Sequence, residues 1–458
     1  MTGHVFDNEK TVIEDGVFLT TKITYDKSVH KGPVKAMHAV GQPPRLGLDC
    51  SYFKYLTEAH IPYSRLHDVG GWFGGNMFVD IPNIFRDFDA DENDPESYDF
   101  TFTDILINAL VENGCEPYFR LGVTIEETEV KCSRVYPPKD FAKWARICEH
   151  VIMHYTEGWA NGFYHKITYW EIWNEPDNAP DDPESIIHNH MWQGTREEFY
   201  ELYTVTAKHL KQRFPHLKIG GYGSCGFYTK HTGTIHGRDI SNSSPRFEYF
   251  ITFFEGFLEY IKREGAPLDF FSWHNYRGYE GVAVYAQYAR DMLDKYGYTE
   301  TETCCNEWST NLRSGTQADC ATRVFVEMLA YQNSCVDSAM AYDGRVTGVT
   351  HSLLFSPETQ RPRMSYFCFK CFNRLYKLKN QTVAHSSDEQ LVVISASDGK
   401  RGGIIIVNPT AESRKLDFTF DLKLDRCYIT EDGLIDFESE LIPKEITAKS
   451  FITLMCDL

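Results

Sequence analysis

The stretch Thr168-Tyr-Trp-Glu-Ile-Trp-Asn-Glu-Pro176 joins a short run of aromatic and β-branched residues to an abrupt polar end. Residues 168–173 have the composition of a buried β-strand. Asn174 and Glu175 follow directly, and Pro176 cannot donate a backbone hydrogen bond to a continuing strand. A buried strand that ends in polar side chains is typical of a parallel sheet whose chemistry lies at the carboxyl ends of its strands.

Similar runs lie on both sides of this stretch. Between residues 36 and 378 short β-type runs alternate with longer amphipathic stretches, and this alternation predicts repeated βα units. The eight expected strands are 34–40, 63–67, 116–121, 168–173, 217–221, 270–275, 303–307 and 337–342. Eight units favour an α/β fold of the (β/α)8 (TIM) barrel type. A doubly wound sheet would need a glycine-rich phosphate loop after its first strand, and Gly41-Gln-Pro-Pro44 does not provide one.

The helical periodicity ends after Leu378. Five short strand-like runs follow, at 391–395, 403–408, 416–420, 427–430 and 450–455, separated by Asp, Gly, Asn and Pro. They predict a small C-terminal β-sandwich over 379–458, beside a barrel over 36–378. A strand-like run at 17–25 indicates that residues 1–35 complete the sandwich from the other end of the chain.

Composition excludes several classes of partner. The chain has 458 residues and a formal net charge of −19, which argues against nucleic acid. No run approaches the roughly 20 apolar residues of a membrane span. The first ten residues show no signal-peptide pattern, and 13 scattered cysteines fit reduced thiols, so we expect a cytoplasmic protein acting on a small substrate. His150 and His154 have helical metal-ligand spacing without the His-Glu-x-x-His order, so we expect neither a metal nor a cofactor.

Two glutamates end expected strands. Glu175 ends the fourth and Glu307 the seventh, so a barrel would bring both to one mouth. Glycoside hydrolysis needs two carboxyl groups that flank one bond. An acid must remain protonated near neutral pH, so we expect apolar surroundings or a second carboxylate around it.

The run Tyr169-Trp-Glu-Ile-Trp-Asn-Glu-Pro176 resembles the strand-4 motif of clan A glycoside hydrolases. Within that clan the chain resembles glycoside hydrolase family 39, the family of β-xylosidases and α-L-iduronidases, from about residue 36 to the end. The similar segments are Leu46-Gly-Leu-Asp49, Pro138-Lys-Asp-Phe-Ala-Lys-Trp144, residues 192–208, Leu268-Asp-Phe-Phe-Ser-Trp-His-Asn-Tyr276 and Cys305-Asn-Glu-Trp-Ser309.

The resemblance implies roles for residues at four strand ends. Glu175 would be the general acid/base and Glu307 the nucleophile of a retaining double displacement. Arg65, in the second expected strand, and Tyr276, after the sixth, match positions that hydrogen-bond the nucleophile.

The resemblance also implies a subsite for one sugar. Asn174 matches the residue that binds the sugar 2-hydroxyl, and His67 and His274 match positions that line the −1 subsite. Glu171 lies in mid-strand, and we expect it to be a structural partner of a barrel arginine.

Two positions depart from the family pattern. His67 is followed by Asp68, where xylosidases of the family usually have glycine; Asp68 would bond a sugar hydroxyl or cap the next segment. The eighth strand lacks the clan's tryptophan, and Tyr342 would take its place under the sugar with Asp343 near O4. The sugar therefore stays open between a β-xyloside, an α-L-arabinopyranoside, a β-galactoside and a uronide. A uronide would need a cationic clamp, for which Arg277 and Arg345 are the candidates.

These features predict a retaining, exo-acting, β-xylosidase-like enzyme of carbohydrate metabolism that cleaves terminal sugars from small oligosaccharides. Long loops at 177–194 and 224–245 would close the cleft beyond one sugar. An inactive carbohydrate-binding protein on the same fold is the alternative, although both glutamates are present. The oligomeric state is left open, with a homo-oligomer among the alternatives.

Overall fold

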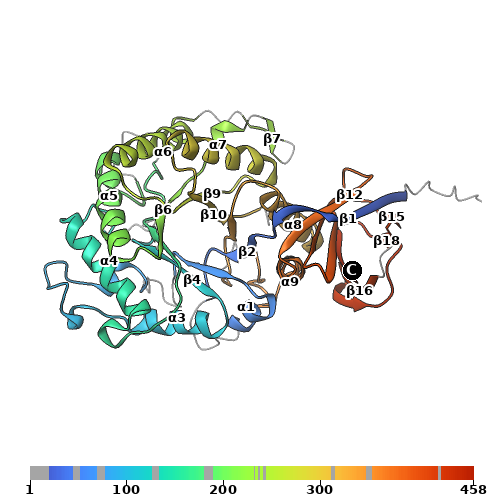
Figure 1. Ribbon diagram of the computed structural model, residues 1–458, viewed down its shortest axis with the longest axis horizontal. Coiled ribbons are helices and arrows are strands. Elements are labelled where there is room, and N and C mark those ends of the chain that lie inside the picture. Colours follow the sequence, from blue (N-terminus) through green and yellow to red (C-terminus); the bar gives the residue numbers. More distant parts are fainter. Residues whose placement is uncertain are drawn as a thin grey trace, which may run out of the picture.

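A barrel of strands ringed by helices lies beside a second sheet built from both ends of the chain (Figure 1). The computed structural model describes residues 20–44, 52–69, 78–125, 134–179, 189–231, 233–235, 238–240, 244–310, 315–346, 353–420 and 424–458. None of the helices in these ranges is long and apolar enough to cross a membrane.

The barrel is closed and its eight strands are parallel. In chain order they are β2 (Ala36–Val40), β3 (Tyr63–Leu66), β4 (Glu116–Leu121), β5 (Tyr169–Ile172), β6 (Lys218–Ser224), β9 (Phe270–Asn275), β10 (Glu302–Trp308) and β11 (Ser338–Ala341). Pairing of β11 with β2, for example Ala341 beside Val40, closes the circle. All eight predicted strands and the predicted TIM barrel are confirmed.

Helices follow the strands around the outside of the barrel (Figure 1). They are α1 (Phe53–Ala59), α2 (Ile81–Ile84), α3 (Thr101–Glu112), α4 (Phe141–Thr156), α5 (Arg196–Arg213), α6 (Pro245–Glu264), α7 (Val282–Lys295), α8 (Gln317–Gln332) and α9 (Tyr366–Tyr376). Local chemistry sets their ends. A capping box between Thr195 and Glu198 starts α5, and Gly265, with φ 64°, ends α6 in the left-handed conformation.

Side-chain alternation decides which residues enter the barrel. On β5, Trp170 and Ile172 face the large core under the helices, whereas Tyr169 packs against the smaller cluster inside the barrel. That inner cluster contains Ala39, Tyr118, Phe270, Cys304 and Met340. Apolar and aromatic side chains therefore fill the lower barrel, and polar residues occupy the layers toward the mouth.

The second sheet has nine strands in the order β17-β16-β19-β14-β13-β12-β1-β15-β18. Their bounds are β1 (Thr20–Pro33), β12 (Asn380–Ser386), β13 (Val392–Ser397), β14 (Arg401–Asn408), β15 (Arg414–Phe418), β16 (Leu424–Glu431), β17 (Leu434–Ser439), β18 (Glu445–Ile446) and β19 (Ser450–Asp457). β1 lies antiparallel to β12 and parallel to β15, so an N-terminal strand completes this sheet, as predicted. Residues 17–19 of the expected run lie outside the described residues. A separate hairpin joins β7 (Gly233–Ile235) to β8 (Arg238–Ile240).

This sheet has two apolar faces. On β14, Ile404 and Ile406 belong to the sheet's own core, which also contains Ile446 from its opposite edge, so the sheet folds over itself as a sandwich does. Ile405 points the other way, into the core shared with the barrel helices. In that shared core Phe451 of β19 meets Phe325 of α8 edge to face, with ring centroids 5.0 Å apart.

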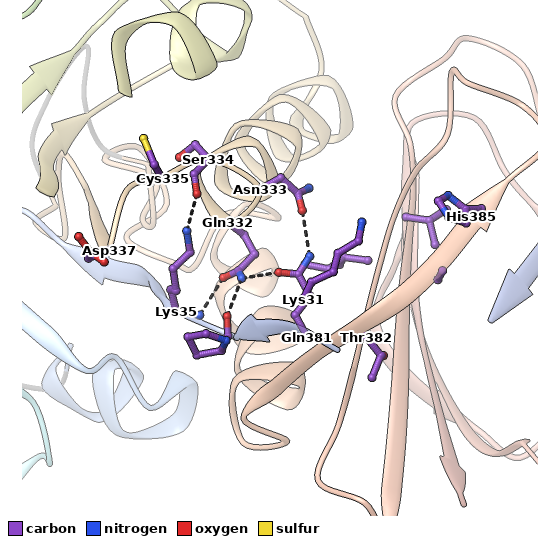
Figure 2. A pocket seen from close by; sticks show the side chains of 14 residues that line it. Lys31, Lys35, Gln332, Asn333, Ser334, Cys335, Asp337, Gln381, Thr382 and His385 are labelled. Atoms are coloured by element: carbon purple, nitrogen blue, oxygen red, sulfur yellow. Dashed lines mark hydrogen bonds between the residues drawn. The ribbon is translucent and has the colours of Figure 1, made fainter. Parts of the chain in front are cut away.

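A polar contact also joins the two parts (Figure 2). Gln332, at the end of α8, donates to Oε1 of Gln381 on β12 at 2.7 Å and accepts from the backbone of Lys35 at 2.8 Å. A pocket of about 600 Å³ lies beside these residues. Its lining includes Lys35 and Asp337, which precede β2 and β11, so the pocket is at the amino-terminal end of the barrel. Chemistry in such barrels occurs at the opposite end.

Candidate active site

Glu307 lies at the carboxyl end of β10 and is only 4 % exposed. Its Oε1 accepts a hydrogen bond from Nη1 of Arg65 at 2.6 Å, and its Oε2 accepts one from the Tyr276 hydroxyl at 2.5 Å. Both oxygens of this buried carboxylate are thus held by hydrogen bonds, one of them from a charged donor.

Arg65 is fully buried on β3 and holds three side chains at once. Besides Glu307, it donates from Nε to Glu171 at 2.6 Å and from Nη2 to Asn174 at 2.5 Å. The planar guanidinium fixes the relative directions of these bonds, which an ammonium group would not do. The expectation that Glu171 is a partner of a barrel arginine is confirmed.

Ser272 and Asn306 were not singled out from the sequence. Both donate to Oε1 of Glu171 at 2.6 Å, while Oε2 of the same carboxylate binds Arg65. Glu171 thus accepts three hydrogen bonds, which hold its carboxylate in place. Its fixed position in turn orients the guanidinium that binds Glu307.

An irregularity in β10 allows Asn306 and Glu307 to enter the barrel together. Strict alternation would send neighbouring residues to opposite faces. The pairing of β10 with β9 shifts register between Cys305 and Glu307, which is a β-bulge, and Glu307 then lies beside His274. Consequently Asn306 reaches Glu171 while Glu307 reaches Arg65.

Glu175 follows β5 and adopts an unusual backbone conformation, with φ 42°. Its Oε1 lies 2.7 Å from Nδ1 of His274, and its Oε2 accepts from the Asn178 side chain at 2.9 Å. Asn178 is itself held by Arg246, whose Nη2 donates to its Oδ1 at 2.7 Å. Asn178 and Arg246 are further site residues that the sequence did not reveal.

The protonation of Glu175 differs from the sequence-based expectation. Burial raises the pKa of this carboxyl, but the hydrogen bond and charge of His274 outweigh burial and lower the pKa below its ordinary value. Burial lowers the pKa of His274, yet the negative charges of Glu307 and Glu175 raise it above its usual value. His274, for which the sequence predicted only a sugar contact, thus reverses the effect of burial on the pKa of Glu175.

His67 and Asp68 border Glu307 on another side. His67 Nε2 lies 3.1 Å from Oδ1 of Asp68 and 4.0 Å from Oε1 of Glu307. Burial, together with the positive charge of Arg65, lowers the pKa of His67 well below its usual value, so this imidazole is neutral. Burial and the charge of Glu307 raise the pKa of Asp68 to about 6.

Tyr342 and Asp343 follow β11 and reach the same mouth. The Tyr342 hydroxyl donates to Oδ2 of Asp68 at 3.0 Å, and the Tyr342 ring lies edge to face with Tyr276, 6.0 Å between centroids. Asp343 accepts from Nε and Nη2 of Arg345 at 3.1 and 3.0 Å, and Nη1 of Arg345 binds the Asp68 carbonyl at 2.8 Å.

The ten candidate residues named from the sequence therefore gather at the carboxyl ends of the strands. They are Arg65, His67, Asp68, Asn174, Glu175, His274, Tyr276, Glu307, Tyr342 and Asp343. Glu175, His274 and Glu307 each have one potential metal-ligand atom, and these three atoms lie within 4.8 Å of one another. Such a trio could hold a metal ion, but hydrogen bonds from Arg65 and Tyr276 already occupy both oxygens of Glu307.

A family model for glycosyl hydrolases family 39 matches residues 54–305, more than half of the chain. The chain belongs to glycosyl hydrolase family 39. The match spans five of the eight barrel strands, β3, β4, β5, β6 and β9, and the first part of β10, to Cys305.

Two curated relatives of the chain are named β-xylosidases. The chain is 26% identical over 212 residues to the β-xylosidase of Geobacillus stearothermophilus, covering 44% of this chain and 35% of that protein. It is 25% identical over 230 residues to the β-xylosidase of Caldicellulosiruptor saccharolyticus, covering 49% and 38%. The aligned part thus spans little more than a third of the length of these relatives.

Solved structures share the fold over nearly the whole chain. A glucosidase from Croceicoccus marinus superposes with a TM-score of 0.73 at 19% identity, covering 96% of this chain and 99% of that one. A monomeric β-xylosidase from Caulobacter crescentus CB15 gives a TM-score of 0.62 at 17% identity, covering 95% and 99%. Likeness at this level of identity shows a shared fold that covers both the barrel and the second sheet.

Proposed function

We propose that this family 39 protein is a retaining, exo-acting glycoside hydrolase of the β-xylosidase type. The distance between its two glutamates supports the proposal most directly. Retaining enzymes hold their carboxyl groups about 5 to 5.5 Å apart, whereas inverting enzymes leave about 6.5 to 9.5 Å for a water molecule. An oxygen of Glu175 lies within 4.8 Å of one of Glu307, which favours retention.

The proposed reaction has two displacements. Glu307 attacks the anomeric carbon and forms a glycosyl ester, while Glu175 passes a proton to the departing glycosidic oxygen. Water then attacks the same carbon, Glu175 takes the proton from that water, and Glu307 leaves as a carboxylate. Arg65 and Tyr276 suit this role of Glu307, because they stabilise the charged nucleophile before attack and after release.

The subsite chemistry favours a neutral sugar over a uronide. A uronide carboxylate would need a cationic partner. Each nitrogen of the Arg345 guanidinium already binds Asp343 or the Asp68 carbonyl, and Arg277 lies over the rings of Tyr228 and Phe247. Since the relatives are named β-xylosidases, a terminal β-xyloside is the leading substrate, with an α-L-arabinopyranoside or a β-galactoside as neutral alternatives.

Two buried ring nitrogens are suited to sugar hydroxyls. Among the described residues, Nδ1 of His67 and Nε2 of His274 have no hydrogen-bond partner. Buried polar atoms normally have one, so a bound sugar is a fitting source. The proposal of exo action rests on the lengths of two loops, at 177–194 and 224–245. Parts of these loops lie outside the described residues, namely 180–188 in the first and 232, 236–237 and 241–243 in the second.

A matched pair of variants tests the two glutamates. Glu307→Ala should lose hydrolysis, and azide should restore turnover of an activated aryl glycoside with an inverted glycosyl azide as product. Glu175→Ala should keep glycosylation of activated substrates, and azide should then give a product of retained configuration, because it replaces the attacking water.

The first measurement is hydrolysis of a panel of aryl α- and β-glycosides, followed by NMR of the sugar before mutarotation. Retained configuration of the first product supports the double displacement. Inverted product, or equal activity of Glu307→Ala and the wild type, would exclude the proposed mechanism. Sugar binding without hydrolysis of any glycoside would instead support the inactive binding protein.

A further inference from the structure

His274 projects from β9 to a point between the two catalytic glutamates. Its Nδ1 lies 2.7 Å from Oε1 of Glu175 and 3.5 Å from Oε2 of Glu307. The side chain is fully buried. A single ring nitrogen therefore contacts the carboxyl group that must carry a proton and lies close to the one that must not.

The second oxygen of Glu175 already accepts a hydrogen bond. Oε2 faces the amide nitrogen of Asn178, and Arg246 fixes that orientation because it donates to the amide oxygen. The short contact between Oε1 of Glu175 and Nδ1 of His274 is therefore the place where these two groups can share a proton.

The surrounding charges decide on which side of that contact the proton rests. Glu307 and Glu175 are negative and favour an imidazolium, whereas Arg65 is positive and opposes one. The balance raises the pKa of His274 and lowers that of Glu175, so the resting proton belongs to the histidine. Neutral His67 adds no charge.

We propose that His274 holds the proton which Glu175 delivers, so that imidazole and carboxyl work as one proton-sharing pair. In the first displacement this one proton moves from Nδ1 to Oε1 of Glu175 and from there to the leaving oxygen, as the bond from that oxygen to the anomeric carbon breaks. In the second, Glu175 takes a proton from the attacking water, and the pair returns to its resting state. His274 is a positioning residue that acts through Glu175, and its role rests on the proposed glycosidase function.

The pair is coupled to the nucleophile. When Glu307 becomes an ester it loses the negative charge that most strongly favours the imidazolium. The proton is then released from His274 at the step that requires it at the leaving group. When Glu307 departs as a carboxylate, its charge returns and the imidazole can be protonated again.

Nitrogen NMR of the labelled imidazoles tests the pair without any substrate. His274 should be doubly protonated at neutral pH, while His67, equally buried beside Glu307, stays neutral and serves as an internal control. Glu307→Gln, which removes the charge and keeps the shape, should lower the titration midpoint of His274 by about 1 to 3 pH units. A neutral His274 at pH 6, or a midpoint that Glu307→Gln leaves unchanged, would overturn the proposal.

Kinetics provide a second readout. His274→Asn retains an N–H donor near the Nδ1 position but cannot take up a proton. Its kcat should fall by about tenfold or more for poor leaving groups and little for activated ones, with KM nearly unchanged. An equal loss for all leaving groups would reduce His274 to a structural residue. If no glycoside is hydrolysed, the proposed function fails, whereas the NMR titration still reports whether the pair exists.

Discussion

Asp68 lies near Glu307, at a position where the family resemblance leads one to expect glycine. Its carboxylate contacts His67 and the Tyr342 hydroxyl, and burial with the charge of Glu307 raises its pKa to about 6. An unfolded aspartate titrates near 3.9. Between about pH 4 and 6 the Asp68 carboxyl therefore keeps its proton in the folded protein and loses it in the unfolded chain. Folding is therefore penalised as pH rises through this window, and the full penalty applies above it.

Asp68→Asn should remove this penalty. The difference in the free energy of unfolding, variant minus wild type, should grow by up to about 3 kcal/mol as the pH rises from 4 to 7. Two pKa units correspond to roughly that amount. Urea unfolding at several pH values measures the difference.

Asp319→Asn is the control for that experiment. Hydrogen bonds from Thr316 at the start of α8 lower the pKa of Asp319 to about 2. Its contribution is fully present above about pH 4 and is lost only at lower pH, so the difference from wild type should be constant between pH 5 and 7. A pH-independent difference for Asp68→Asn as well would contradict the assigned shift.

At the scale of elements, the carboxyl end of β6 shapes the site through a missing side chain. Gly223 has φ 62°, and a Cβ there would lie 2.8 Å from Oδ1 of Asn174, 3.0 Å from Nη2 of Arg65 and 3.1 Å from Nε2 of His274. The strand thus approaches the buried hydrogen-bond network more closely than any other residue type would allow.

Gly223→Ala should therefore damage the site as well as the backbone. We expect kcat/KM to fall at least tenfold, in addition to a stability loss of about 1 kcal/mol for a left-handed alanine. Gly265→Ala is the matched control, because Gly265 has φ 64° and no atom within 4 Å of the added Cβ. It should lose similar stability and keep its activity. Equal kcat/KM for both variants would show that Gly223 matters only for the backbone.

At the scale of the whole molecule, the barrel and the nine-stranded sheet share one core. Ile405 and Phe451 of the sheet belong to the same apolar cluster as the barrel helices, and Gln332 and Gln381 add a polar link. We therefore expect the two parts to unfold together.

Ile405→Ala tests this coupling. Truncation of a buried isoleucine costs about 2 to 5 kcal/mol. Calorimetry should show a single transition at lower temperature, and activity should be lost in that same transition. Two separate transitions, with the activity of the barrel unaffected by Ile405→Ala, would show that the parts are independent.

Several features could be predicted from the sequence because their causes are local. Alternating apolar runs placed all eight barrel strands, and the fourth and seventh runs carried their own polar endings, so Glu175 and Glu307 could be assigned to strand ends. Asp68 and Tyr342 stood out as departures from a known pattern. Composition and periodicity also predicted the second sheet and its N-terminal strand, since β propensity and turn residues act over a few positions.

Only the tertiary structure decided how these side chains meet. The bulge in β10 turns Glu307 inward beside Asn306, although alternation alone would admit just one of them. Arg65 gathers Glu171, Asn174 and Glu307 from other strands, and His274 alters the protonation of Glu175 from across the barrel. Hydrogen bonds and charges act through space, over distances of a few ångströms that depend on register and barrel closure. The amino-acid sequence alone therefore predicts the strands, but it does not predict the distances between side chains on different strands.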